Sequence, residues 1–94
     1  MISSEIPLSM LLEQNYPNPF SYETGIIFSL SQNGHVKLQL FNKSSKCIAI
    51  LINKELQPGS YSYNFKSAGL ASDYYYYRIT IGNFVAVRKM SIEK

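Results

Sequence analysis

The sequence predicts an all-β fold, a seven-stranded antiparallel sandwich of two sheets. Apolar and polar residues alternate along several short runs, the turns between the runs are polar, and no run has a helical period. Aromatic residues make up 14% of the chain, with eight Tyr, five Phe and no Trp, and aromatic side chains suit the half-buried surface of a pleated sheet. At 94 residues the chain supports one compact domain.

The pattern divides the chain into a short leading segment and one domain. Residues 1–10 have no period and include Pro7, so we interpret them as a linker. The apolar end of this segment, residues 8–12, is expected to touch the domain, which we take to span residues 11–94.

The domain opens with two closely spaced prolines in the stretch Asn15-Tyr16-Pro17-Asn18-Pro19-Phe20. Each proline pushes the residue before it out of the helical region, so this stretch should run extended and turning. Tyr16 and Phe20 are expected to be apolar anchors. The two Asn side chains can bond to the backbone ahead of them, which would fix the chain direction without a partner elsewhere.

Predicted strands follow one another through the first half of the domain. Gly25 to Leu30 and His35 to Asn42 both alternate with period two. The segment Ser31 to Gly34 should turn, because Asn-Gly tolerates the positive backbone angles of tight hairpins. After a polar turn at residues 43–46, the β-branched residues of Cys47 to Asn53 favour a strand, although parity does not assign its buried face.

The second half repeats this organisation. A Pro-Gly turn at residues 57–59 precedes an alternating strand from Tyr61 to Phe65. In the run Tyr74 to Ile81, parity separates an inward set from an outward one, which are Tyr75, Tyr77, Ile79 and Ile81 against Tyr74, Tyr76, Arg78 and Thr80. Tyr75 lies five residues after Leu70. This placement fits the tyrosine corner of immunoglobulin-like sandwiches and equally fits an ordinary core tyrosine.

The last predicted strand returns along the one before it. Gly82-Asn83 is expected to be a two-residue hairpin loop, followed by a strand from Phe84 to Ile92. Alternation falters at Arg88-Lys89, where a bulge is possible. Taken together, the strands predict a core that includes Ile26, Phe28, Val36, Leu38, Leu40, Tyr63, Phe65, Tyr75, Tyr77 and Ile79.

Composition argues against several partners. The net charge is +3 and the basic residues are scattered, so no nucleic-acid partner is expected. No apolar run approaches the roughly 18 residues of a membrane span, and the first residues lack the features of a signal peptide. The single Cys47 forbids an internal disulfide. We expect it to be buried as a small apolar residue.

The sequence also lacks the residues of a catalytic or metal site. His35 is the only histidine and Asp73 the only aspartate, they belong to distant segments, and nothing selects a serine to join them. Cys47 and His35 are single and the Glu residues are dispersed, so no metal ligands and no cofactor are expected. No glycine-rich phosphate loop is present. We therefore do not expect an enzyme.

Segments spread over residues 11–94 match one family in order, and they are Leu12-Glu13-Gln14-Asn15-Tyr16-Pro17-Asn18-Pro19-Phe20, Ile26 to Leu30, Val36 to Asn42, Pro58-Gly59, Ala68-Gly69-Leu70, Tyr75 to Ile79 and Arg88-Lys89-Met90. They resemble the C-terminal sorting domain (type A) of the type IX secretion system of Bacteroidetes. The fold of that family is similar to the immunoglobulin-like domain of flagellar hook-capping proteins. Residues 1–10 would correspond to the linker that joins such a domain to its upstream cargo.

Six positions depart from the family pattern. The opening motif is usually followed by Asn-Pro-Ser-Thr, whereas this chain has Ser21-Tyr22-Glu23-Thr24, of which Thr24 alone matches. Ser45 stands at a tight-turn glycine, Phe65 at a core tryptophan, and Asp73 at a glycine before the tyrosine strand. Asp73 is a residue type that can still adopt left-handed angles.

The resemblance implies a non-catalytic address for export. Such domains are recognised in the periplasm by the secretion machinery, and the cargo then reaches the cell surface or the medium. The implied recognition residues are the opening motif and the basic end of the last strand, namely Asn15, Tyr16, Pro17, Asn18, Pro19, Phe20, Arg88, Lys89, Met90 and Lys94. Two other classes remain open. The chain could be a passive immunoglobulin-like spacer or adhesion module, or a carbohydrate-binding module that stacks sugars on Tyr74 and Tyr76 if their rings are exposed and coplanar.

Overall fold

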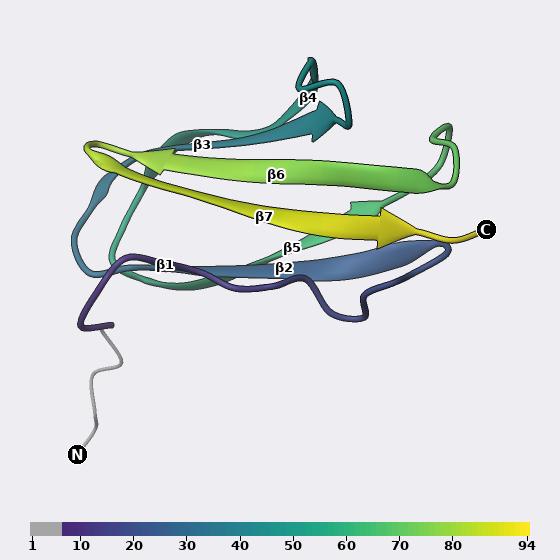
Figure 1. The fold of residues 1–94 in the computed structure, drawn as a ribbon. Helices are drawn as coiled ribbons and strands as arrows, with labels where there is room; N and C mark the ends of the chain where they lie inside the picture. The colour runs from purple at the N-terminus through teal and green to yellow at the C-terminus, as the bar shows by residue number, and fades with distance from the viewer. Residues whose placement is uncertain (1–6) are drawn as a thin grey trace.

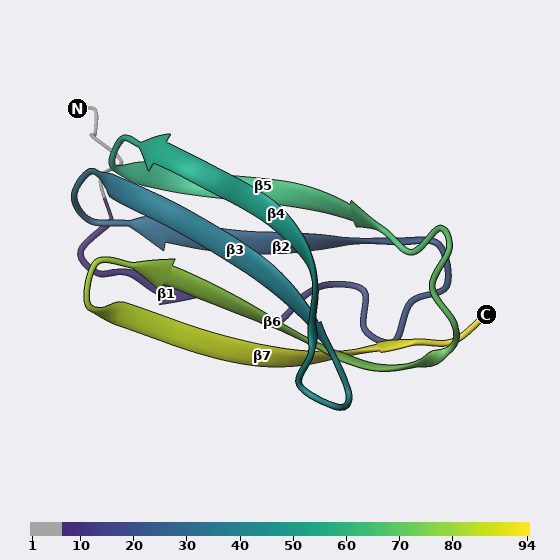
Figure 2. The same ribbon diagram turned by 90° about the horizontal axis from the view of Figure 1, so that it is seen from above.

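The computed structural model describes residues 7–94, which form seven β-strands and no helix. The strands are β1 (Leu11–Leu12), β2 (Glu23–Leu30), β3 (Gly34–Asn42), β4 (Cys47–Leu56), β5 (Gly59–Lys66), β6 (Asp73–Ile81) and β7 (Phe84–Ile92). One sheet has the order β1-β2-β5 and the other β4-β3-β6-β7, with every strand pair antiparallel. Figure 1 shows the two sheets as two stacked layers, and Figure 2 views them from above. The predicted seven-stranded antiparallel sandwich is confirmed.

The strand order is that of an immunoglobulin-like sandwich. The chain crosses between sheets after β2, β4 and β5, while β3 pairs with β4 and β6 pairs with β7. At the start of β6, Tyr75 is buried and its hydroxyl donates a hydrogen bond to the Ala71 carbonyl at 2.8 Å. This bond back to the backbone is the defining contact of a tyrosine corner, which distinguishes Tyr75 from an ordinary core tyrosine.

The core lies between the two sheets and agrees with the prediction at nearly every position. All the predicted members are buried except Tyr63, which is partly buried and packs against the others. Two aromatic pairs help to fill it. The rings of Phe20 and Phe65 meet edge to face at 6.2 Å, and those of Phe28 and Tyr61 stack at 5.4 Å, both favourable aromatic geometries.

Two irregularities in the pairing of β3 with β4 explain why β4 has no readable parity. The register shifts between Leu38 and Gln39 and again between Leu40 and Phe41. Each shift places an extra residue on β4 and reverses the face to which the following side chains point. The strand prediction for this segment is confirmed, and its single continuous pattern is broken by these bulges.

The bulge suggested at Arg88-Lys89 is not present. The register of β7 against β6 is continuous, with Arg88 opposite Tyr77 and Lys89 opposite Tyr76. Arg88 has the inward parity of Met90, but β7 is an edge strand, and the Arg88 Nε reaches out of the sandwich to the Leu12 carbonyl at 3.0 Å. The alternation falters because a charged side chain occupies an inward position at the rim, as edge strands tolerate.

The turns agree with the sequence in part. Gly82-Asn83 is a two-residue hairpin loop as predicted, with a positive φ of 59° at Gly82. Ser45 has a φ of 67°, a left-handed conformation at the position where the resembled family has a tight-turn glycine. The chain turns at Ser31 to Gly34 as predicted, but the turn is not a tight hairpin, because β2 and β3 lie in different sheets and neither Asn33 nor Gly34 has a positive φ.

Cys47 is exposed, which corrects the expectation that it is buried. It begins β4, the outer strand of its sheet, and lies opposite Phe41 in the register. Its sulfur is 3.6 Å from Gln39 Nε2 on the outer face of the sheet. Residues 1–6 of the predicted linker lie outside the described residues. In the remainder of that segment, Leu8 is fully exposed and Met10 packs against the core.

Removing a buried leucine should measure how much this small core contributes. Leu38 is fully buried in β3, so we expect Leu38→Ala to lower the free energy of unfolding by about 2 to 5 kcal/mol through lost contacts and a residual cavity. Leu8→Ala is the matched control, because Leu8 is exposed, and should change it by less than about 0.5 kcal/mol. Chemical denaturation measures both. A loss at Leu38 as small as that at Leu8 would show that Leu38 does not belong to the core.

Candidate functional site

The opening motif and the end of the last strand lie against each other. We call this the motif–strand junction, formed by Asn15–Phe20 and Arg88–Lys94. Tyr16 exchanges two backbone hydrogen bonds with Gly25 of β2, at 3.0 and 2.9 Å. At the other end of the motif, Phe20 N–H donates to the Ser91 carbonyl at 3.1 Å, and the Phe20 carbonyl accepts from Glu93 N–H at 2.8 Å. The motif therefore joins a strand of one sheet to a strand of the other.

A buried amide organises the first half of the motif. Asn15 is 2% exposed, and its Nδ2 donates to the Pro17 carbonyl at 3.2 Å and to Thr24 Oγ1 at 3.1 Å. The Thr24 hydroxyl in turn donates to the same Pro17 carbonyl at 2.7 Å. The Asn15 Oδ1 accepts from Gln14 Nε2 at 2.7 Å. A buried polar side chain stabilises a fold only when its hydrogen bonds are satisfied, as they are here.

The second half of the motif is fixed by the last strand. Asn18 Oδ1 accepts a hydrogen bond from Ser91 N–H at 2.9 Å, so the expectation that the motif needs no partner elsewhere was wrong. Both peptide bonds before the prolines, Tyr16-Pro17 and Asn18-Pro19, are cis. Phe20 is 5% exposed and is the predicted apolar anchor, whereas the Tyr16 side chain is 83% exposed and is not an anchor within residues 7–94.

Three consecutive residues ahead of the motif are also held from the opposite sheet. The Leu12 carbonyl accepts from Arg88 Nε at 3.0 Å, and Gln14 Nε2 donates to the Lys89 carbonyl at 2.7 Å. Between them, the Glu13 carbonyl accepts from the Tyr77 hydroxyl at 2.7 Å. The parity of β6 predicts that Tyr77 points inward, but no local pattern predicts this contact, because its partner lies 64 positions away in the sequence.

The basic residues at the end of the chain have different environments. Met90 is fully buried and belongs to the core. The ammonium of Lys89 lies 3.8 Å from the centre of the Tyr74 ring, and the Lys94 ammonium donates to the Ser67 carbonyl at 3.2 Å. Arg88 and Lys89 are exposed charges on the surface of an edge strand. Of the four implied residues here, Met90 alone is inaccessible.

Two of the departures from the family pattern, Ser21 and Tyr22, lie where the contacts are made by the backbone. Ser21 and Tyr22 accept hydrogen bonds from Ser67 through their backbone carbonyls, at 2.6 and 2.9 Å. Thr24, the residue that matches, is the one whose side chain enters the Asn15 network. Side-chain changes at Ser21 and Tyr22 therefore leave the junction intact.

Asp73 does not adopt left-handed angles, although its residue type can. It begins β6, and its carboxylate accepts from Tyr74 N–H at 2.8 Å and pairs with Lys43 Nζ at 3.0 Å. The Tyr74 N–H, and after it the Lys43 ammonium, hold the pKa of the Asp73 carboxyl below its ordinary value.

The edge of β7 is covered over part of its length. In an antiparallel pair, alternate residues direct their backbone groups to the partner strand and away from it. Lys89 and Ser91 direct theirs away from β6, toward the opening motif. Val85 and Val87 share that parity, and among residues 7–94 no backbone or side-chain hydrogen bond reaches their outward N–H and carbonyl groups. The first half of β7 is thus an open sheet edge.

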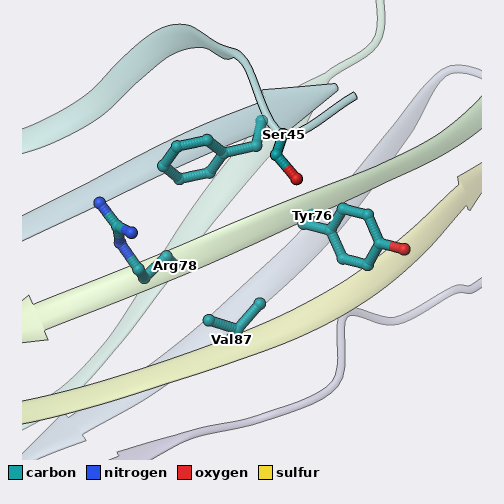
Figure 3. A pocket seen from close by; sticks show the side chains of 5 residues that line it. Ser45, Tyr76, Arg78 and Val87 are labelled. Atoms are coloured by element: carbon teal, nitrogen blue, oxygen red, sulfur yellow. The ribbon is translucent and has the colours of Figure 1, made fainter. Parts of the chain in front are cut away.

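Tyr74 and Tyr76 lie on the outer face of the four-stranded sheet. Tyr74 is 50% exposed with Lys89 over its ring. Tyr76 is partly buried and lines a shallow hollow of about 290 Å³ together with Phe41, Ser45, Arg78 and Val87 (Figure 3). One ring therefore has a cation over one face and the other is partly buried, so the two rings do not form a fully open stacking platform.

His35 and Asp73, the histidine and the aspartate of the chain, contact different residues and do not form a common site. His35 Nε2 is 2.6 Å from Asn53 Oδ1 and its Nδ1 is 3.9 Å from Glu55, while Asp73 pairs with Lys43. Within residues 7–94, no three His, Cys, Asp or Glu side chains are grouped to hold a metal ion. In the same range, no helix is long and apolar enough to cross a membrane. No family model, curated protein or solved structure matches the chain.

Adjacent residues of the motif provide a test of the buried amide. Asn15→Ala should lower the free energy of unfolding by about 1 to 3 kcal/mol, because the Thr24 hydroxyl and Pro17 carbonyl lose a buried partner. Tyr16→Ala, at an exposed side chain, should change it by less than about 0.5 kcal/mol. Equal losses in denaturation experiments would place the stabilising contact elsewhere in the motif.

Tyr77, whose hydroxyl holds the Glu13 carbonyl ahead of the motif, should make the stability of the domain sensitive to high pH. Burial raises the pKa of its hydroxyl from 10.0 to about 12. Below pH 10 the folded and unfolded chains both keep this proton, so its stabilising effect is complete; between pH 10 and about 12 only the unfolded chain loses it, and stability falls. Over that range, wild type should lose about 1 to 3 kcal/mol more than Tyr77→Phe, which has no hydroxyl to titrate. Parallel stability curves would contradict a raised pKa.

Proposed function

We propose that this domain is a non-catalytic sorting domain, which directs a fused cargo protein across the outer membrane through the type IX secretion system. The observation that carries the proposal is the motif–strand junction. The two segments that resemble the ends of the family's signal, Asn15–Phe20 and Arg88–Lys94, are hydrogen-bonded to each other at Phe20 and Asn18. The segments implied in recognition thus form one folded surface.

The proposal assigns different tasks to the residues of that surface. Asn15, Phe20 and Met90 are buried and hold the junction together. Tyr16 has an exposed aromatic ring with no structural task in the described residues, so it is available to secretion-machinery proteins. Arg88 and Lys89 add exposed positive charges to β7. A partner strand could pair with the backbone groups along the open edge of this strand. The cargo would be the covalently linked upstream domain, and the route would lead through the periplasm to the cell surface or the medium.

A fusion experiment tests the proposal. A reporter protein with an ordinary export signal, fused ahead of residues 1–94, should reach the surface of a type IX-competent bacterium. Removing Lys89 to Lys94 should abolish export, but it also removes buried Met90 and Ile92, so the folding of this truncation must be checked. Replacing Lys89 and Lys94 by Gln tests the basic end with the core intact, since exposed charges change stability by no more than about 0.5 kcal/mol.

Two controls make the outcome decisive. The host must export a known type IX cargo in parallel, and Tyr16→Ala should reduce export while the domain stays as stable as wild type. If the intact fusion remains in the periplasm of a competent host, the sorting proposal fails. The passive immunoglobulin-like spacer or adhesion module would then be the better assignment.

A further inference from the structure

The outer face of the four-stranded sheet has an unusual composition for a solvated surface. In an antiparallel sandwich, the face of each sheet that points to solvent is normally polar. Here Tyr74, Val85 and Val87 are each at least half exposed, and Ile50 on β4 is 54% exposed. Val87 lines the shallow hollow shown in Figure 3, and the other three lie on the same face of the sheet by the register of their strands. Exposed aliphatic and aromatic groups that gather on one face are typical of a binding surface.

Arg78 stands in the wall of that hollow. Its guanidinium lies 4.7 Å from the centre of the Phe41 ring, and one nitrogen donates to Gln39 Oε1 at 3.0 Å. These two contacts fix the plane of the guanidinium and use one of its five N–H donors. No carboxylate within residues 7–94 pairs with it. The group is thus oriented, half-buried and able to accept a carboxylate from outside the chain.

Among residues 7–94, the charged side chains in the middle of the same face are positive. Lys37 and Lys89 have the same outward parity as Arg78. The carboxylates near this face are at its borders, where Glu55 lies beside His35 and Asp73 pairs with Lys43. A second copy of the chain docked through this face would bring like charges together, which opposes self-association. The complementary surface is acidic.

We propose that this face docks a partner protein whose contact surface presents an Asp or Glu carboxylate among apolar side chains, with the carboxylate bound to Arg78 in the hollow. The apolar side chains around Arg78 would supply the buried contact area. The pair of Arg78 with the carboxylate would fix the position of the partner on the face. The proposal goes beyond the sorting function, because the hollow contains none of the motif–strand junction residues. A domain that sorts cargo and one that serves as a spacer could both use it.

The surroundings of Arg78 favour a protein over an acidic sugar. Sugar rings stack on flat, open aromatic faces. The Tyr74 ring has the Lys89 ammonium over it at 3.8 Å, and Tyr76 is partly buried. The open groups are instead aliphatic, at Val85, Val87 and Ile50, and such side chains pack well against those of another protein.

A peptide titration tests the proposal on the intact domain. The probes are acetyl-Leu-Glu-Leu-amide, its Gln counterpart acetyl-Leu-Gln-Leu-amide, and trigalacturonic acid as the acidic sugar, each followed by two-dimensional NMR at low salt. The Glu peptide should shift the resonances of Phe41, Tyr76 and Val87 and bind about threefold to fivefold more tightly than the Gln peptide, as one exposed charge pair allows. Arg78→Gln should abolish that preference.

Lys37→Gln is the matched control, because it removes one charge from the same face outside the hollow and should keep most of the preference for the Glu peptide. Unchanged spectra of both variants outside the substituted strands verify that they fold. Equal binding of the two peptides, shifts confined to another surface, or no saturable shift up to about 10 mM would overturn the proposal. Tighter binding of the sugar acid at the hollow would also overturn it and identify an acidic carbohydrate as the ligand.

Discussion

The fold depends on the hydrogen bonds by which the opening segment, residues 12–20, joins one sheet to the other. β1 is two residues long and gains little from pairing with β2 alone. What holds the segment is the buried Asn15 amide on one side and the contacts of Leu12, Glu13 and Phe20 with the opposite sheet on the other. These bonds close one side of the sandwich and satisfy the backbone of an edge strand that would otherwise be bare.

A recognition signal at the end of β7 cannot be deleted without also disturbing the fold. Because Met90 and Ile92 are core residues and Phe20 bridges to Ser91 and Glu93, deleting the last residues also removes part of the packing. A loss of function after truncation therefore reports on stability as much as on recognition. Exposed positions such as Tyr16 separate the two, because they can change without disturbing the junction.

Local pattern predicted most of the fold, and the errors arose where distant contacts decide. Strict alternation identified β3 and β6 and the inward side chains of Leu38 and Tyr77. It could not orient β4, since two bulges reverse its faces, and it mistook the edge position of Arg88 for a bulge. The Asn18 bond to Ser91 spans 73 positions, so no local signal predicts it. Exposure of Tyr16 and Cys47 likewise depends on what the rest of the fold leaves uncovered.

Amide hydrogen exchange along β7 tests most directly whether the opening segment is docked against this strand. Val87 and Ser91 have the same parity in one edge strand, and both direct their N–H away from β6. Ser91 N–H is bonded to Asn18 of the opening segment, whereas Val87 N–H has no partner within residues 7–94. If the opening segment is docked in solution, the Ser91 amide should exchange at least about a hundredfold more slowly than that of Val87. Equally fast exchange at both amides would contradict the account.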